Sequence, residues 1–285
     1  MNQLAAEGKT KHAIHKFQIK LNQILTEAEL DDVIAVNPCR KIRERVKPEE
    51  TTRKSLSLAE AVSLAACLKS EPRDGYRVVV WLALALGLRR GELLGLQWRD
   101  VDWENCKICV QRQYNSRCEL DEPKGGSKAT ISFDTGTKRF LLEWKVIQAQ
   151  QYAEYGRTPT LETPICSPTV LVKDGRAADY IEPTNFDRWR RHYFADHGLG
   201  EFTRIREVKT KRGEIETKYS GYEGYNLHEL RHTQATLLIG NNVDLKTVQS
   251  RLRHSSASTT MGTYAHAIDA NDELAAETIG ELLNL

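Results

Sequence analysis

The sequence predicts a mainly α-helical fold with a small antiparallel β-sheet, an α+β arrangement preceded by a helical fragment. Two observations carry this prediction. Along the 285 residues, many segments show the roughly 3.6-residue apolar period of a helix, or a compact apolar run. Two β-rich stretches, residues 107–114 and 129–133, flank a turn-rich segment at 122–127, a pattern typical of neighbouring antiparallel strands.

Residues 1–40 are predicted to form a helical fragment. Thr10 can cap a helix, and one apolar stripe follows it at helical spacing. The stripe comprises Ile14, Phe17, Leu21, Ile24 and Ala28. Asn37-Pro38 should end the regular structure, and the charged residues 41–54 should form a linker. A lone helix with an uncovered apolar face is only marginally stable in water, so we expect that the helices against which it would pack are missing and that the protein is N-terminally shortened. We also expect proteases to remove the residues before about 55 first.

The main domain is predicted over residues 55–285. It opens on a capping box, Ser57-Leu-Ala-Glu60, which starts a helix through Leu68. Further helices are expected at residues 75–87, 92–96, 137–155, 183–194, 229–240 and 245–252, and from 258 onward. A short hairpin is expected at 164–174.

Composition narrows the possible classes of protein. The net charge is only +2, so any nucleic-acid surface must come from local clustering of cations. The longest apolar run, residues 78–88, is too short to span a membrane, and the N-terminus lacks the apolar region of a signal peptide, so we expect no membrane partner. Six cysteines in a chain of this length indicate a reducing compartment. Cys106 and Cys109 form a CxxC in a strand-like stretch without a second ligand pair, so we expect no metal there.

Residues 228–232 match HExxH, the signature of zinc metallopeptidases, in which two histidines one helical turn apart bind zinc. The glycine and histidine that extend this motif in one peptidase class are missing. The next glutamate is Glu273, and His254 is the only nearby substitute for a third ligand. Arg231 would also have to sit beside a dication. A zinc peptidase therefore remains a minor alternative.

The same residues also read as His-x-x-Arg, and two further motifs accompany them. Residues 86–98, LGLRRGELLGLQW, hold an arginine after Gly-Leu, and residues 252–266 run from LRHSS to TYAH, with a tyrosine ten residues after a histidine. Between the first and second motifs lies Glu122-Pro-Lys-Gly-Gly. Their types and order resemble the tyrosine recombinase (phage integrase) family over roughly residues 57–266. Arg253 stands where that family usually has glycine, which leaves the local turn open.

The resemblance implies a set of catalytic residues: Arg89, Lys124, His228, Arg231, His254 and Tyr264. The residue types suit attack on a phosphodiester. Guanidinium groups bind the charged oxygens bidentately. A tyrosine with a pKa near ~10 needs histidines to take its proton, and the basic leaving alkoxide needs a lysine as acid. Lys128 is the rival of Lys124. Arg90 is expected to be a surface residue at a helix end, Glu92 to be structural and to orient an arginine, and His232 to pack or hydrogen-bond within the fold.

Residues 204–218 are strongly basic. We predict that Arg204, Arg206, Lys209, Lys211 and Arg212 bind DNA; a solvated hairpin arm without a ligand is the alternative.

The resemblance further implies a site-specific recombinase or integrase that cuts and rejoins DNA through a 3′-phosphotyrosine, integrating or excising a mobile element. It also implies that residues 1–40 are part of a helical core-binding domain, and that a homotetramer forms on double-stranded attachment sites. The resemblance also implies that accessory DNA-bending or excision factors take part and that the protein acts in the cytoplasm. It implies that the reaction needs no metal, ATP or other cofactor. A type IB topoisomerase-like strand transferase, which acts without a partner site, is the alternative.

Overall fold

The computed structural model describes residues 7–42, 54–123, 128–173, 176–209 and 214–253. The chain divides into two compact units, Met1–Thr52 and Arg53–Leu285. Among the described residues, no helix combines the length and the apolar character that crossing a membrane requires.

The first unit contains helix α2 (Lys11–Leu30) and the short 3₁₀ helix η1 (Pro38–Lys41). Thr10 caps α2 as predicted: its side chain accepts the Ala13 N–H at 3.2 Å. The predicted stop at Asn37-Pro38 is wrong in detail, because α2 already ends at Leu30 and Pro38 begins η1. The buried Asn37 amide donates to Thr26 Oγ1 at 3.0 Å, which ties η1 to α2.

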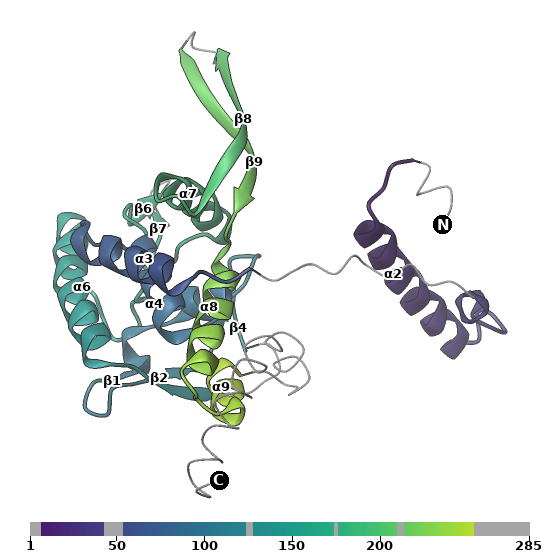
Figure 1. Ribbon diagram of the computed structural model, residues 1–285, viewed down its shortest axis with the longest axis horizontal. Helices are drawn as coiled ribbons and strands as arrows, with labels where there is room; N and C mark the ends of the chain where they lie inside the picture. Colours follow the sequence, from purple (N-terminus) through teal and green to yellow (C-terminus); the bar gives the residue numbers. More distant parts are fainter. Residues whose placement is uncertain (1–6, 43–53, 124–127, 174–175, 210–213, 254–285) are drawn as a thin grey trace, which may run out of the picture. The chain divides into compact units, whose positions relative to one another are not determined.

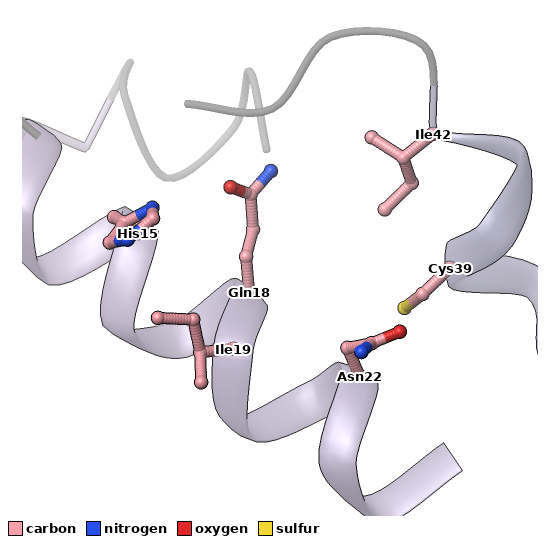
Figure 2. A pocket seen from close by; sticks show the side chains of 6 residues that line it. All are labelled: His15, Gln18, Ile19, Asn22, Cys39 and Ile42. Carbon is pink, nitrogen blue, oxygen red and sulfur yellow. The ribbon is translucent and has the colours of Figure 1, made fainter. Parts of the chain in front are cut away.

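The predicted apolar stripe of α2 is only partly buried. Ile14 is 4% exposed, whereas Phe17 and Ile24 are 51% and 64% exposed. A small pocket between α2 and η1 is lined by His15, Gln18, Ile19, Asn22, Cys39 and Ile42 (Figure 2). This pocket contains none of the predicted site residues.

The second unit is mostly helical, with small antiparallel sheets, so the predicted fold class is confirmed. Its helices are α3 (Leu58–Ser70), α4 (Gly75–Leu86), α5 (Arg90–Gly95), η2 (Trp98–Asp100), α6 (Thr135–Glu154), α7 (Pro183–Asp196), α8 (Leu227–Gly240) and α9 (Leu245–Leu252). The predicted helix from 258 onward lies outside the described residues. The capping box of α3 is present: the side chain of Ser57 accepts from the Glu60 N–H, and that of Glu60 from the Ser57 N–H.

Helix α4 is the centre of the core. Most of its apolar run is buried, with Val78, Leu82 and Leu86 fully enclosed and Leu84 and Ala85 partly exposed, and it packs against α8. The helix ends at Gly87, which has the left-handed conformation (φ 65°). A Cβ at Gly87 would lie 2.3 Å from Gln234 Oε1, so glycine is required where α4 meets α8.

The predicted strands form a sheet of order β1-β2-β5: β1 (Val101–Asp102), β2 (Lys107–Val110) and β5 (Ala129–Ser132). β2 and β5 pair antiparallel, with Ile108 opposite Ile131. The predicted strand 107–114 is interrupted: β3 (Gln113–Tyr114) pairs separately with β4 (Leu120–Asp121).

The hairpin predicted at 164–174 is wrong for most of its length. A hairpin forms only between β6 (Val172–Lys173) and β7 (Arg176–Ala177). Pro164 instead forms an isolated antiparallel bridge with Gln97, and the Ile165 carbonyl accepts the Trp144 indole N–H of α6 at 2.7 Å. Gln148 Nε2 donates to the Pro164 carbonyl at 2.8 Å. These tertiary hydrogen bonds replace the partner strand.

The basic segment forms the predicted hairpin, built from two ten-residue strands, β8 (Gly200–Lys209) and β9 (Ile215–Gly224). Figure 1 shows this hairpin, hereafter the arm, projecting beyond the helices with α7 near its base. His192 of α7 contacts the rings of Phe202 and Tyr219 at centroid distances of 4.7 and 4.9 Å, which anchors one side of the arm.

Candidate active site

Arg89 lies where α4 gives way to α5, and Glu92 holds it there. Glu92 is 1% exposed and faces back toward the start of α5. Its Oε2 accepts the Arg89 backbone N–H at 2.9 Å, and its Oε1 accepts Arg89 Nη1 at 2.9 Å. An acidic residue in the first turn suits the helix N-terminus, and here it also orients a guanidinium group. The expectation that Glu92 is structural and orients an arginine agrees with these contacts.

Arg231 reaches the same place from α8. Its side chain is almost fully buried, and Nη1 donates to the Gly87 carbonyl at 2.7 Å. Nη2 donates to the carbonyl of Leu252 at the end of α9. Arg89 Nη2 donates to the next carbonyl, that of Arg253, at 3.2 Å. Two arginines predicted from separate motifs therefore converge on consecutive carbonyl groups, directly before His254.

His228 lies one helical turn before His232 on α8. His228 is exposed and His232 is buried, and their rings meet edge to face with centroids 4.7 Å apart. His228 is thus accessible to a substrate, whereas His232 packs within the fold, as expected.

The glutamate of the HExxH pattern acts at the start of α8. Glu229 Oε2 accepts the Asn226 backbone N–H at 2.6 Å, and Asn226 Oδ1 accepts the His228 N–H at 2.9 Å. This is a reciprocal capping box. Within the described ranges, no cluster of three or more His, Cys, Asp or Glu side chains could hold a metal ion. Glu229 therefore acts as a helix-capping residue in the described structure.

Several predicted site residues lie outside the described residues: Lys124, Lys211, Arg212, His254 and Tyr264. The rival lysine, Lys128, is described and exposed just before β5. Arg90 was expected to be a surface residue at a helix end; it is partly exposed and forms an ion pair with Asp187 of α7.

Seven tyrosines of the described chain have a pKa above the ordinary value, which does not suit a nucleophile. Burial raises the pKa of all seven: Tyr76, Tyr114, Tyr152, Tyr180, Tyr193, Tyr222 and Tyr225. For Tyr114 the pKa rises to about 12. A nucleophilic phenol needs the opposite shift. These residues are better suited to packing and hydrogen bonding.

The arm has two distinct faces, because side chains alternate along a strand. Arg204 and Arg206 share one face, and the register places Lys218 directly opposite Arg206. Lys209 lies on the other face, with Ile205 and Tyr219. Among the described residues, Arg204, Arg206 and Lys218 form no ion pair. Lys218 was absent from the predicted set, although its position in the basic segment was a usable signal.

Arg253 was also missed as a site residue. Its Nη1 donates to Glu92 Oε1 at 3.0 Å, so it shares this carboxylate with Arg89. The only signal in the sequence was the departure from glycine at this position.

Comparison with known proteins shows which proteins the chain resembles. Residues 203–271 match the phage integrase family. The chain is 28% identical to a tyrosine recombinase XerC-like protein of Caldanaerobacter subterraneus subsp. tengcongensis, over 99% of this chain and 69% of that protein. It is 25% identical to the ICEBs1 integrase of Bacillus subtilis, over 98% of this chain and 68% of the relative.

Solved structures of DNA integrases have a similar fold. The Tn1549 transposon integrase in complex with circular intermediate DNA aligns with a TM-score of 0.67 at 19% identity, covering 97% of this chain and 83% of that one. A lambda integrase dimer bound to a core site aligns at 0.60 and 19% identity, over 92% and 76% of the two chains. The fold is therefore that of a tyrosine recombinase. In sequence and fold, the chain is similar to tyrosine recombinases, and part of it matches the phage integrase family.

Proposed function

We propose that this chain is a site-specific DNA recombinase that cleaves and rejoins DNA through Tyr264, integrating or excising a mobile element. The observation that carries the proposal is the convergence of Arg89 and Arg231 on the carbonyl groups of Leu252 and Arg253. Both candidate phosphate-binding groups thereby meet at the end of α9, directly ahead of the segment that contains His254 and Tyr264.

The chemistry is a phosphate ester exchange. Tyr264 Oη attacks the scissile phosphorus, the bond from phosphorus to the 5′ oxygen breaks, and a 3′-phosphotyrosine forms. Arg89 and Arg231 stabilise the negative charge on the non-bridging oxygens. His228, with His254, takes the phenol proton, and Lys124 protonates the leaving 5′ oxygen. The 5′-hydroxyl of a second strand then reverses the step. Since one ester replaces another, no ATP is required.

The cationic face of the arm supports binding to the DNA backbone. Like charges placed directly opposite each other destabilise a strand pair. Arg206 and Lys218 are such a pair, and both are exposed. A phosphate between them would remove this repulsion and release counterions. We therefore propose Arg204 and Arg206 as DNA contacts on this face, together with Lys211 and Arg212, which lie outside the described residues, whereas Lys209 faces away from Arg204 and Arg206.

The wider assembly follows from the same proposal. Double-stranded attachment sites are the partners, and four copies of the chain would exchange strands between two sites in the cytoplasm, with accessory bending or excision factors. Residues 1–40 would be part of a DNA-binding helical domain, residues 41–54 its linker and residues 55–285 the catalytic domain.

A nicked suicide duplex tests the proposal. It should carry the attachment sequence, recovered by sequencing the junctions of the integrated element. The chain should form a covalent adduct with it. Tyr264→Phe should abolish the adduct and keep DNA binding, whereas Tyr155→Phe, an exposed tyrosine at the end of α6, should leave both intact. An adduct that persists in Tyr264→Phe contradicts the assignment. Relaxation of supercoiled DNA without any partner site would indicate a topoisomerase instead.

A further inference from the structure

Arg253 adopts a backbone conformation that disfavours its own residue type. It ends α9 with φ 55° and ψ 46°, the left-handed region. Glycine adopts this region without steric strain, whereas a residue with a Cβ is strained there. Glycine would therefore fit this backbone with less strain than arginine does.

The side chain points into the protein rather than into solvent. It is 5% exposed, and the carboxylate that it meets, that of Glu92, is 1% exposed. Glu92 Oε1 accepts from Arg253 Nη1 at 3.0 Å and from Arg89 Nη1 at 2.9 Å. The Arg253 carbonyl also accepts from Arg89 Nη2 at 3.2 Å. Arg253 thus contacts both members of the Arg89–Glu92 pair.

This arrangement changes the electrostatics of Arg89. With Glu92 alone, a guanidinium and a carboxylate would neutralise each other, and Glu92 would oppose the attraction of Arg89 for a phosphate. A second guanidinium on the same oxygen leaves two positive groups against one negative group. The trio then has net positive charge in a partly buried place, where charges interact more strongly than in water.

We propose that Arg253 is a positioning residue for the strand-transfer reaction. By sharing Glu92, it fixes the Arg89 guanidinium and keeps its charge available to the scissile phosphate. Its own guanidinium is almost fully enclosed and meets Arg89 at the shared Glu92 carboxylate. This inference rests on the proposed function.

Three variants of the full chain test the proposal. Arg253→Gly suits the left-handed backbone and removes the guanidinium. Arg253→Lys keeps the charge without the planar fork. Lys246→Ala removes an exposed cation from the same helix and serves as the matched control. The measurements are the rate of adduct formation on the nicked suicide duplex, the affinity for an uncleaved duplex of the same sequence, and the melting temperature.

We expect Arg253→Gly to slow adduct formation by roughly tenfold or more, because an aligned charge is lost beside the phosphate-binding group. DNA affinity and melting temperature should stay close to those of the unmodified protein. Guanidinium chloride below denaturing concentrations should restore part of the rate, and an equal concentration of sodium chloride should not. Arg253→Lys should be intermediate, and Lys246→Ala should behave as the unmodified chain.

Two results would overturn the role of Arg253. One is an unchanged rate in Arg253→Gly. The other is a slower rate in Arg253→Gly that guanidinium does not rescue and that is accompanied by comparable losses of DNA affinity and melting temperature. That pattern would show that Arg253 has a purely structural role. If the unmodified chain forms no adduct, the proposed function itself fails, and this outcome is distinct from the other two.

Discussion

The same residue type serves in two opposite environments in this protein. Arg231 is 1% exposed, and both of its terminal nitrogens donate to main-chain carbonyl groups. Arg206, on the arm, is exposed and faces Lys218. The first arrangement fixes a guanidinium before any substrate arrives, which is what transition-state stabilisation requires. The second leaves the charge mobile and screened by salt, which suits attraction to a DNA backbone.

The largest effect expected from this contrast is that of Arg231→Ala. The substitution removes the donor from two buried carbonyl groups, so we expect a loss of about 2–4 kcal/mol in the free energy of unfolding. Adduct formation should fall by roughly a hundredfold or more. Urea unfolding and single-turnover cleavage measure the two effects. Arg206→Ala is the matched control and should change stability by no more than about 0.5 kcal/mol. If both variants unfold at the same urea concentration, the contrast between a buried arginine and an exposed one does not hold.

Lys124 and Lys128 test which lysine acts as the general acid. Replacing Lys124 by Ala should slow cleavage of an ordinary phosphodiester by roughly 10²- to 10⁴-fold. A substrate with a 5′-thio leaving group should react almost normally, because a thiolate departs without a proton. Lys128→Ala should affect neither substrate strongly. If the thio substrate rescues Lys128→Ala instead, the exposed lysine before β5 is the acid.

The arm should have a smaller and salt-dependent effect. Arg206→Ala and Lys218→Ala should each weaken binding across DNA sequences and reduce the slope of log affinity against log salt by about 1. Lys209→Ala should have less effect, because Lys209 lies on the opposite face. Titrations over a range of salt concentrations measure this. A slope that changes as much for Lys209 as for Lys218 would show that the arm does not bind DNA by one face.

Chelation should have the smallest effect. Adduct formation should survive EDTA unchanged, because guanidinium groups supply the positive charge that a metal provides in other phosphoryl-transfer enzymes. The measurement is the cleavage rate with and without EDTA, with added zinc as the control. Activity that disappears on chelation and returns with zinc would support the HExxH interpretation.

The sequence predicted the parts of the fold that depend on local chemistry. The Ser57 capping box, the Gly87 helix end and the basic hairpin all follow from short-range rules, and the structure has them. The motifs likewise identified Arg89 and Arg231, although not their partners. Those partners are carbonyl groups distant in the sequence, which no local pattern reveals.

The incorrect predictions likewise concern residues whose structure depends on partners distant in the sequence. A hairpin was predicted at residues 164–174, but the carbonyl groups of Pro164 and Ile165 accept from the Trp144 and Gln148 side chains of α6, and Pro164 bridges to Gln97. Arg253 was noticed only as a departure from glycine, because its role depends on Glu92, a residue in another motif. Catalytic roles for Lys124, His254 and Tyr264 stay predictions.

The first described residues of the second unit are fastened to α8. The Leu56 N–H donates to Thr233 Oγ1 at 2.8 Å, and the Tyr225 hydroxyl donates to the Ser55 carbonyl at 3.5 Å. Thr233 lies two residues after Arg231, on the same helix. One hydrogen bond thus joins the start of the second unit to the helix that carries His228 and Arg231, so Thr233→Val should loosen both the entry to α3 and the support of that helix.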